Sequence, residues 1–264
     1  METSDIAIIA SAQDRAGMNI AENLRQLREF PAMIGGKSVS LHVVQERVTK
    51  ADLSGIAAGM FIFASRHVSK AGVHSLTVHS IGNFGEAADG GEKGTLVPAP
   101  AALMKSCLQL LDEKVAKEKL NYEVMQEATH HGPLLEKPAM FIEIGSDEER
   151  WADAGAGKIV AETIIEAIKN YGGEEEKTAV GIGGTHYCAN LRKVAMGSEL
   201  AIGIVCPKHH LLLLDEAMLR QMLEKTAPKA EMAVLDWKGL GQEKARILAL
   251  LESIGVPYKR TKDY

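Results

Sequence analysis

Short runs of β-branched and apolar residues alternate with amphipathic stretches along almost the whole chain. This pattern predicts strands near residues 5–10, 39–44, 60–64, 75–80, 122–128, 139–144, 178–183, 200–206 and 231–235. It predicts helices near residues 16–29, 100–119, 147–170, 190–197, 213–226 and 241–254. Because strands and helices alternate from one end to the other, we expect an α/β fold with a mixed, largely parallel sheet flanked by helices.

Local signals refine this outline at three places. Ser146 to Glu149 has the S-x-x-E pattern of a capping box, which predicts a helix directly after a strand ending at Gly145. The glycine-rich stretch 82–100 is expected to be a long surface loop. A weaker break at 132–138 suggests two halves, but nothing resembles a flexible linker. We therefore expect one domain over residues 1–264, built from two closely packed lobes.

Composition and charge narrow the classes of partner. The chain has 264 residues, 46% of them hydrophobic, and no apolar run of the roughly 18 residues that a membrane-spanning helix needs. We expect a cytoplasmic protein that is a monomer or a small homo-oligomer. The formal net charge of -5 disfavours extensive binding to duplex DNA. A local basic patch remains open, and its candidates are Arg192, Lys193, Lys208, Lys259, Arg260 and Lys262.

The three cysteines give no sign of a disulfide framework or a cysteine-based zinc site, because their number is odd and none are spaced as C-x-x-C. Cys188, two residues after His186, is either a nucleophile, a thiolate ligand or a small buried side chain. A metal site in this chain must depend mainly on histidine and carboxylate ligands.

Seven of the nine histidines lie near the ends of predicted strands: His67, His79, His130, His131, His186, His209 and His210. In a parallel α/β sheet, the loops beyond the carboxyl ends of the strands surround one crevice. We therefore expect several of these side chains to face a shared site, although any single histidine can instead be a hydrogen-bonded structural residue.

Three imidazoles and one water are the usual ligands of catalytic zinc, which brings the pKa of the bound water toward about 7. Glu127 and Glu143 also lie at or near strand ends. Either can be a metal ligand, a residue that orients an imidazole, a general base or a structural carboxylate. Asp14 is placed either to line the same crevice or to cap the helix that follows it.

The sequence does not contain the complete form of any of four familiar ligand-binding or catalytic motifs. Residues 181–186 begin like a dinucleotide fingerprint, but the sixth position is His186 instead of glycine. Residues 155–158 read Gly-Ala-Gly-Lys, but Ile159 follows in place of the Ser or Thr of a phosphate-binding loop. There is neither an H-E-x-x-H nor a G-x-S-x-G motif.

Several blocks together resemble the archaeal and plant family of D-aminoacyl-tRNA deacylases (D-tyrosyl-tRNA deacylases), over most of the chain. The more specific blocks are Thr-His-His-Gly-Pro at 129–133 and Gly-Gly-Thr-His-Tyr at 183–187. The others are residues 10–11, 16–20, 64–67, 76–79, 82–85 and 143–146, together with residues 181–182, which directly precede the second of these blocks. The family pattern continues after His-Tyr with Ala-Pro, whereas this chain has Cys188 and Ala189.

The resemblance implies hydrolysis of the ester between a D-amino acid and the terminal ribose of tRNA, a form of translational proofreading, with Zn²⁺ as cofactor. The partner is then the aminoacylated 3′ end of tRNA. It also implies a fold like those of nucleoside phosphorylases and peptidyl-tRNA hydrolase. Alternatives that the residues leave open are a nucleoside phosphorylase-like enzyme, a metal-dependent peptidase and a non-enzymatic protein that binds tRNA or zinc.

We assign roles to individual residues from the chemistry of their side chains. The expected metal ligands are drawn from His67, His79, His130, His131 and His186. The expected catalytic residues are His131, His186, Glu127 and Glu143. The expected substrate-binding residues are Arg66, Asn83, Gly132, Gly183, Gly184, Thr185, Tyr187 and Lys208.

Overall fold

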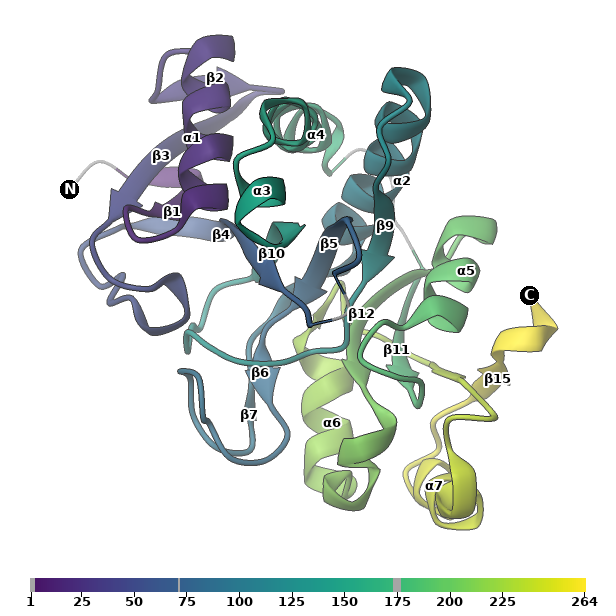
Figure 1. Cartoon of the computed structure of the whole chain (residues 1–264). Helices are drawn as coiled ribbons and strands as arrows, with labels where there is room; N and C mark the ends of the chain where they lie inside the picture. Colours follow the sequence, from purple (N-terminus) through teal and green to yellow (C-terminus); the bar gives the residue numbers. More distant parts are fainter. Residues whose placement is uncertain (1–2, 71, 173–176) are drawn as a thin grey trace.

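The larger of the two main sheets has seven strands in the order β2-β3-β1-β4-β10-β5-β9. A computed structural model describes residues 3–70, 72–172 and 177–264 (Figure 1). The strands are β1 (Ser4–Ser11), β2 (Ala32–Ile34), β3 (Lys37–Val44), β4 (Ala58–Val68), β5 (Ser75–Ser80), β9 (Glu123–Gln126) and β10 (Ala139–Ser146). β1, β3, β4 and β10 are parallel, whereas β2 and β5 run antiparallel to their neighbours β3 and β10. The sheet is thus mixed and mostly parallel, as predicted.

Helices cover one face of this sheet (Figure 1). They are α1 (Arg15–Leu27), α2 (Ala101–Glu118), α3 (Glu148–Trp151) and α4 (Ala154–Asn170). Ile8, Ile62 and Ile142 point to this face and belong to the largest apolar cluster. On the opposite face Phe63 and Phe141 stack with ring centroids 4.6 Å apart, at the centre of a smaller cluster. This opposite face also carries the polar residues described below.

The smaller sheet has four parallel strands in the order β12-β11-β14-β15. They are β11 (Thr178–Ile182), β12 (Ala201–Cys206), β14 (Ala233–Leu235) and β15 (Tyr258–Arg260). The remaining helices are α5 (Ala189–Gly197), α6 (Glu216–Lys225) and α7 (Lys244–Ser253), with short 3₁₀ turns at Val48–Lys50, Lys208–Leu213, Gly241–Glu243 and Thr261–Asp263. Two small ribbons pair β6 (Gly82–Asn83) with β7 (Thr95–Leu96), and β8 (Ala99–Pro100) with β13 (Thr226–Ala227).

The segment after β9 joins the two sheets. The Gln126 amide donates to Ile202 O (2.9 Å), and Thr129 N donates to Val205 O (3.1 Å). Ala128 N donates to His186 O (2.8 Å), beside a bridge between Glu127 and Tyr187. One apolar cluster contains residues of both sheets, among them Leu76 and Ile204. The organisation as one domain with two lobes stays a prediction.

The capping-box prediction was wrong in detail. Ser146 is the buried last residue of β10, and Asp147 caps the helix by accepting from Arg150 N at 3.0 Å. That helix ends at Trp151, and Asp153 caps a second helix by accepting from Gly155 N at 2.8 Å. The single helix predicted over 147–170 is therefore two, because a second aspartate competes for the backbone amides.

The stretch 82–100 is not all surface loop. β6 and β7 pair within it, and Leu96 and Val97 are buried. The loop was predicted because the stretch is rich in glycine, although apolar residues lie among the glycines. β4 also continues to Val68, four residues beyond the predicted end, so His67 lies inside a strand.

Candidate functional site

The strand register places polar side chains together on one face of the large sheet. Glu143 of β10 pairs with Ser65 of β4 on one side and with Thr77 of β5 on the other. Gly145 pairs with His67, and Phe141 pairs with His79. Because alternate residues of a strand face the same side, His67, His79 and Glu143 all lie on the face that the four helices leave uncovered.

This placement corrects the predicted geometry. We expected the histidines to gather beyond the carboxyl ends of parallel strands, but β5 runs antiparallel to β10, so His79 does not lie at the same edge as His67. The side chains meet on the face of the sheet instead. The His79 ring stacks on Phe141 with centroids 4.9 Å apart and the planes 8° apart, which fixes its orientation.

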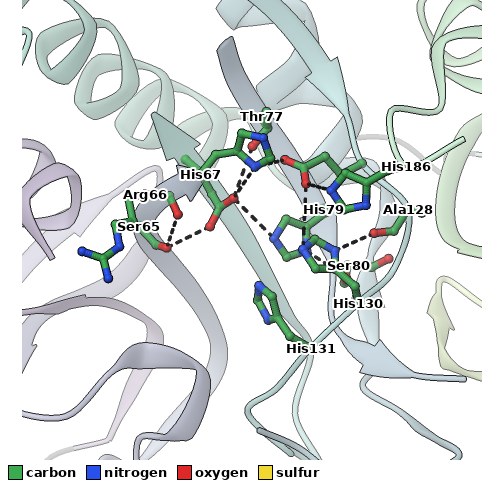
Figure 2. Close-up of polar contacts among 12 residues, drawn as sticks. Ser65, Arg66, His67, Thr77, His79, Ser80, Ala128, His130, His131 and His186 are labelled. Atoms are coloured by element: carbon green, nitrogen blue, oxygen red, sulfur yellow. Dashed lines mark hydrogen bonds and ion pairs between the residues drawn. The ribbon is translucent and has the colours of Figure 1, made fainter. Parts of the chain in front are cut away.

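Two loops complete the cluster from the other side. The segment that joins the sheets carries Glu127, His130 and His131, and His131 adopts a φ of 42°, a conformation uncommon outside glycine. The loop after β11 carries His186. Figure 2 shows His67, His79, His130, His131 and His186 gathered around one space. Adjacent rings of this group lie close, with centroids 4.2 Å apart for His79 and His130 and 4.8 Å apart for His130 and His186.

Glu127 lies at the centre of the cluster and is fully buried. Its Oε2 lies 2.6 Å from His186 Nε2 and 3.8 Å from His130 Nε2, and its Oε1 lies 3.1 Å from His67 Nδ1. Within the described part of the chain, neither carboxylate oxygen receives a hydrogen bond of good geometry. A buried charge without donors is costly unless a cation compensates it. This arrangement fits a bound metal ion.

Glu143 is held differently. Ser65 Oγ donates to its Oε1 at 2.8 Å, and Thr77 Oγ1 lies 3.4 Å from its Oε2. The same Oε2 lies 3.7 Å from His79 Nε2 and 3.8 Å from His67 Nδ1. Glu143 is therefore oriented by two hydroxyl groups, with one oxygen directed at the histidines.

The ring nitrogens are arranged as metal ligands require. Nδ1 of His79, His130 and His131 lies 3.0, 2.8 and 2.7 Å from the backbone oxygens of Ser80, Ala128 and Gly132. A carbonyl only accepts, so each Nδ1 carries a proton, and in the neutral ring Nε2 keeps a free lone pair. The buried Nε2 of His79 has no hydrogen-bond partner among the described residues.

Two groups of three ligand atoms lie within 4.8 Å of one another: His79, His130 and His131, and His67, Glu127 and His186. The Nε2 atom of His67 is hydrogen-bonded to Tyr187 Oη at 2.7 Å, and this hydrogen bond orients the ring with His67 Nδ1 toward Glu127. Residues of the part of the chain described here thus offer nitrogen and oxygen ligands at two adjoining positions.

Burial and charge set the protonation of these groups. Burial would raise the pKa of Glu127, but the imidazoles of His186 and His67 outweigh it and hold that pKa well below its ordinary value. Burial opposes protonation of His67 and His79, yet the neighbouring carboxylates raise the pKa of both rings. Burial, with the nearby His79, holds the pKa of His130 well below its usual range and lowers the pKa of His131 to about 4. His130 and His131 are neutral at pH 7 and can donate lone pairs.

A pocket of about 370 Å³ opens beside this cluster, within the usual size range of small-molecule sites. We call it the histidine pocket. His67, His130, His131, His186 and Glu143 line it.

The histidine pocket is also lined by residues of β4 and of the segments that follow β1, β3 and β6: Arg66, Gln13, Asp14, Arg47, Thr49 and Asp89. The Arg66 guanidinium lies 5.1 Å from the Trp151 ring centroid, and Trp151 Nε1 donates to His67 O at 3.0 Å.

Asp14 caps α1 by accepting from Gly17 N at 2.9 Å and also lines the histidine pocket, so both readings of this residue hold. Its other oxygen accepts from Arg66 N at 3.0 Å, and burial raises its pKa. Sequence reasoning did not find Arg47, Thr49 and Asp89, because they come from loops without a recognisable motif. It also missed Thr77 and Trp151, which are ordinary strand and helix residues by sequence.

Some predicted substrate-binding residues lie elsewhere. Asn83 donates to Gly90 O at 3.0 Å and holds the 90–92 turn. Gly132 is packed so closely that a Cβ there would lie 2.2 Å from Gly91 N, which explains the glycine by packing. Gly184, Thr185, Tyr187 and Lys208 line a separate pocket on the small sheet, and Gly183 packs against Asp236, another residue of its wall. Of the predicted substrate-binding set, Arg66 is the one that lines the histidine pocket.

Cys188 is a buried thiol. It is 1% exposed, and burial raises its pKa far above the ordinary value. This favours the small buried side chain over the nucleophile or thiolate ligand.

Comparison with known proteins gives consistent matches. A family model described as D-aminoacyl-tRNA deacylase matches residues 54–259. A D-aminoacyl-tRNA deacylase of Thermococcus kodakarensis is 41% identical over 78% of this chain and 75% of that protein. The one of Methanosarcina mazei is 35% identical over 97% of this chain and 92% of its own length. A crystal structure described as a conserved protein of unknown function, AF0625, superposes with a TM-score of 0.88 at 29% identity, covering 100% of this chain and 97% of that one.

Proposed function

The chain belongs to the D-aminoacyl-tRNA deacylase family, and from that premise we propose that its histidine pocket hydrolyses the ester bond of D-aminoacyl-tRNA, releasing a free D-amino acid and tRNA. The observation that carries the proposal is Glu127, a fully buried carboxylate faced by imidazole nitrogens beside a pocket of about 370 Å³. The choice of D-aminoacyl-tRNA as substrate rests on the family.

We propose Zn²⁺ as the cofactor, held by His79, His130 and His131, by His67, Glu127 and His186, or by both groups. The donor set fits, since neutral imidazoles with carboxylate are typical of zinc sites. The chemistry supplied by bound Zn²⁺ is Lewis acidity, which makes water more acidic and favours its attack on an ester near neutral pH.

The two glutamates suit different roles. Glu127 is fully buried behind the imidazoles, so it compensates the metal charge and orients His67 and His186. Glu143 lines the pocket, and its Oε2 faces the histidines while Ser65 fixes Oε1. We therefore assign the general base to Glu143, which accepts the proton of the attacking water at Oε2.

The residues at the mouth of the histidine pocket suit substrate binding. The His186 side chain is 42% exposed and can contact the substrate directly. Arg66 presents a cation that can bind an oxygen of the terminal nucleotide. Refusal of L-aminoacyl-tRNA then depends on steric and hydrogen-bond mismatch around the α-carbon.

The partner proposed for the chain is the aminoacylated 3′ end of tRNA. The net charge of -5 disfavours extensive contact with the tRNA body. Within the described ranges, no helix is long and apolar enough to cross a bilayer. A cytoplasmic location, and a monomer or small homo-oligomer, remain proposals.

The decisive experiment incubates D- and L-tyrosyl-tRNA with the protein, with and without a chelator and re-added zinc. We expect D-specific release that the chelator abolishes and zinc restores. Equal release from both enantiomers would refute proofreading, and D-specific release that resists the chelator would remove the metal from the mechanism. Parallel assays with nucleoside plus phosphate and with peptides test the phosphorylase and peptidase alternatives. Zinc binding without any turnover would indicate a non-enzymatic protein.

A matched set of substitutions locates the activity. Replacing His131 or His186 by Ala is expected to reduce release about 100-fold or more, since each offers a ligand atom to the cluster. Replacing His42 or His74, which lie outside it, is expected to leave the rate within about twofold of the unmodified protein.

A further inference from the structure

A second pocket, of about 280 Å³, opens on the small sheet. Its wall includes Gly184, Thr185, Tyr187, Lys208, Asp236 and Lys238. We call it the β11–β14 pocket, because Gly183 and Gly184 follow β11 and Asp236 follows β14. The proposed hydrolysis at the histidine pocket does not use it.

The topology of the small sheet favours a ligand at this place. The chain leaves β11 for β12 on one side, then returns across β11 to β14 on the other, giving the order β12-β11-β14-β15. The order of the strands therefore reverses between β11 and β14. In open parallel sheets, ligands bind in the crevice outside the carboxyl ends of the strands at such a switch point.

The backbone around the switch point is shaped for close approach. Gly183 and Gly184 have φ of 98° and 87°, which favour glycine. A Cβ on Gly239 would lie 2.2 Å from Gly184 N, so the two loops touch through backbone atoms. Asp236, only 7% exposed, holds these loops by accepting from Asn190 Nδ2 at 3.1 Å and Gly239 N at 3.4 Å. Both carboxylate oxygens of Asp236 thus have a hydrogen-bond donor within the protein.

The charge that remains exposed at the β11–β14 pocket is positive. Lys208 and Lys238 are exposed, and neither forms an ion pair with any residue of the described ranges. Lys208 N donates to Gly184 O at 2.9 Å, which anchors its backbone to the wall. Helix α5 starts at Ala189 in the same wall and directs its N-terminal dipole there.

Two further cations pack on Trp237, which lies in sequence between the pocket residues Asp236 and Lys238. The Arg260 guanidinium lies 3.7 Å from the Trp237 ring centroid, and Lys244 Nζ lies 5.3 Å from it. In a chain with a net charge of -5, this concentration of cations selects an anionic ligand.

The β11–β14 pocket and the histidine pocket share a wall. Thr185 and Tyr187 line the former, whereas His186 between them lines the latter. Tyr187 also bonds His67 through its hydroxyl group at 2.7 Å. A chain whose end lies in the histidine pocket can therefore continue into the β11–β14 pocket over one short segment.

We propose that the β11–β14 pocket is a nucleotide subsite that binds a nucleotide of the tRNA 3′ strand next to the aminoacylated terminal residue, with its phosphate between Lys208 and Lys238. This inference rests on the proposed function. It explains how a protein of net negative charge holds an RNA end without contacting its body.

The test measures binding of a fluorescent RNA minihelix with a single-stranded CCA end, not aminoacylated, to the full chain by anisotropy. The variant Lys208→Ala/Lys238→Ala is expected to raise Kd at least tenfold and to reduce the salt slope of log K by about 1 to 2. The control is Lys117→Ala/Lys229→Ala, two exposed lysines elsewhere, Lys229 lying at the opposite edge of the small sheet. The control should stay within about twofold of the unmodified chain.

Two further measurements separate this inference from the proposed function. Hydrolysis of a small D-tyrosine ester by the unmodified chain tests the histidine pocket separately, because the ester reaches only that pocket. If the lysine variant binds the minihelix as tightly as the control does, the subsite is refuted even when deacylation holds. If minihelix binding depends on the lysines but no ester is cleaved, the proposed function fails and the RNA site stands. Competition by free CMP at the concentration of the minihelix would instead indicate a site for free nucleotides and overturn the proposal.

Discussion

Gly145 leaves the space that the His67 ring occupies on the neighbouring strand. The two residues pair across β10 and β4, and a Cβ on Gly145 would lie 2.8 Å from His67 Cδ2 and 3.0 Å from His67 Cβ. A strand glycine often marks close approach of another group. Here that group is a proposed metal ligand.

The variant Gly145→Ala is therefore expected to displace His67. We expect zinc content and deacylation to fall about tenfold or more, with a smaller effect on the folded structure as measured by circular dichroism. Gly197→Ala, where a Cβ would meet nothing within 4 Å, is the control. Full zinc occupancy and full activity in Gly145→Ala would show that His67 does not need this space.

Glu127→Gln keeps the shape of the side chain and removes its charge. Because the carboxylate is buried against imidazoles without good hydrogen bonds, we expect zinc affinity to fall about 10- to 100-fold and activity with it. Zinc content measured after dialysis and the deacylation rate test this. Glu123→Gln, an exposed residue of β9, is expected to change neither. An active, zinc-loaded Glu127→Gln protein would contradict the assigned role.

His131 predicts a pH dependence of stability in the metal-free protein. Burial lowers its pKa in the folded state to about 4, below the ordinary value of 6.5. The unfolded chain then binds the proton more readily, so stability is lost as pH falls from about 6.5 toward 4.

The variant His131→Gln lacks this group, so its unfolding free energy should decline less over that window. The expected difference at pH 4.5 is about 2 to 3 kcal/mol, relative to the difference at pH 7.5. Urea unfolding of both chelator-treated proteins measures it. Parallel pH curves for the two proteins would mean that His131 titrates normally.

Tyr187→Phe removes the hydroxyl group that holds His67 Nε2 at 2.7 Å. Freed from this bond, the ring no longer keeps Nδ1 on Glu127, and we expect zinc affinity to fall about 10-fold or more. Chelator competition gives the affinity, and hydrolysis of a small D-tyrosine ester gives the rate independently of RNA binding. Tyr258→Phe on β15 serves as the control, and identical affinities in the two variants would argue that the bond does not position His67.

The sequence predicted the histidines of the site better than the residues that orient them. The histidines of 129–133 and 183–187 stood in recognisable blocks, and the structure brings His130, His131 and His186 together with His67 and His79. The reason offered for this was wrong, because the antiparallel β5 brings His79 in across the sheet face. Sheet order and direction are set by contacts between distant segments, which local periodicity does not record.

The residues that orient the cluster were harder to find. Thr77, Trp151 and Asp89 have no sequence signal of their own. Thr77 matters because register brings it to Glu143, Trp151 because it binds His67 O, and Asp89 because its loop lines the histidine pocket. The helices were largely predicted, with α2 within one residue at each end of its predicted range. The break between α3 and α4 was missed because two competing aspartate caps, Asp147 and Asp153, lie six residues apart.

The segment of Glu127 is hydrogen-bonded to the loop of His186, and this affects when the site can form during synthesis of the chain. Glu127 and His130 belong to a segment that takes its shape from bonds to Val205 O and His186 O on the small sheet. While the ribosome has made only the first sheet, those acceptors do not exist and His186 is absent. The nascent chain therefore carries most of the histidines but not their arrangement, and the histidine cluster forms only after β12 has been made and docked.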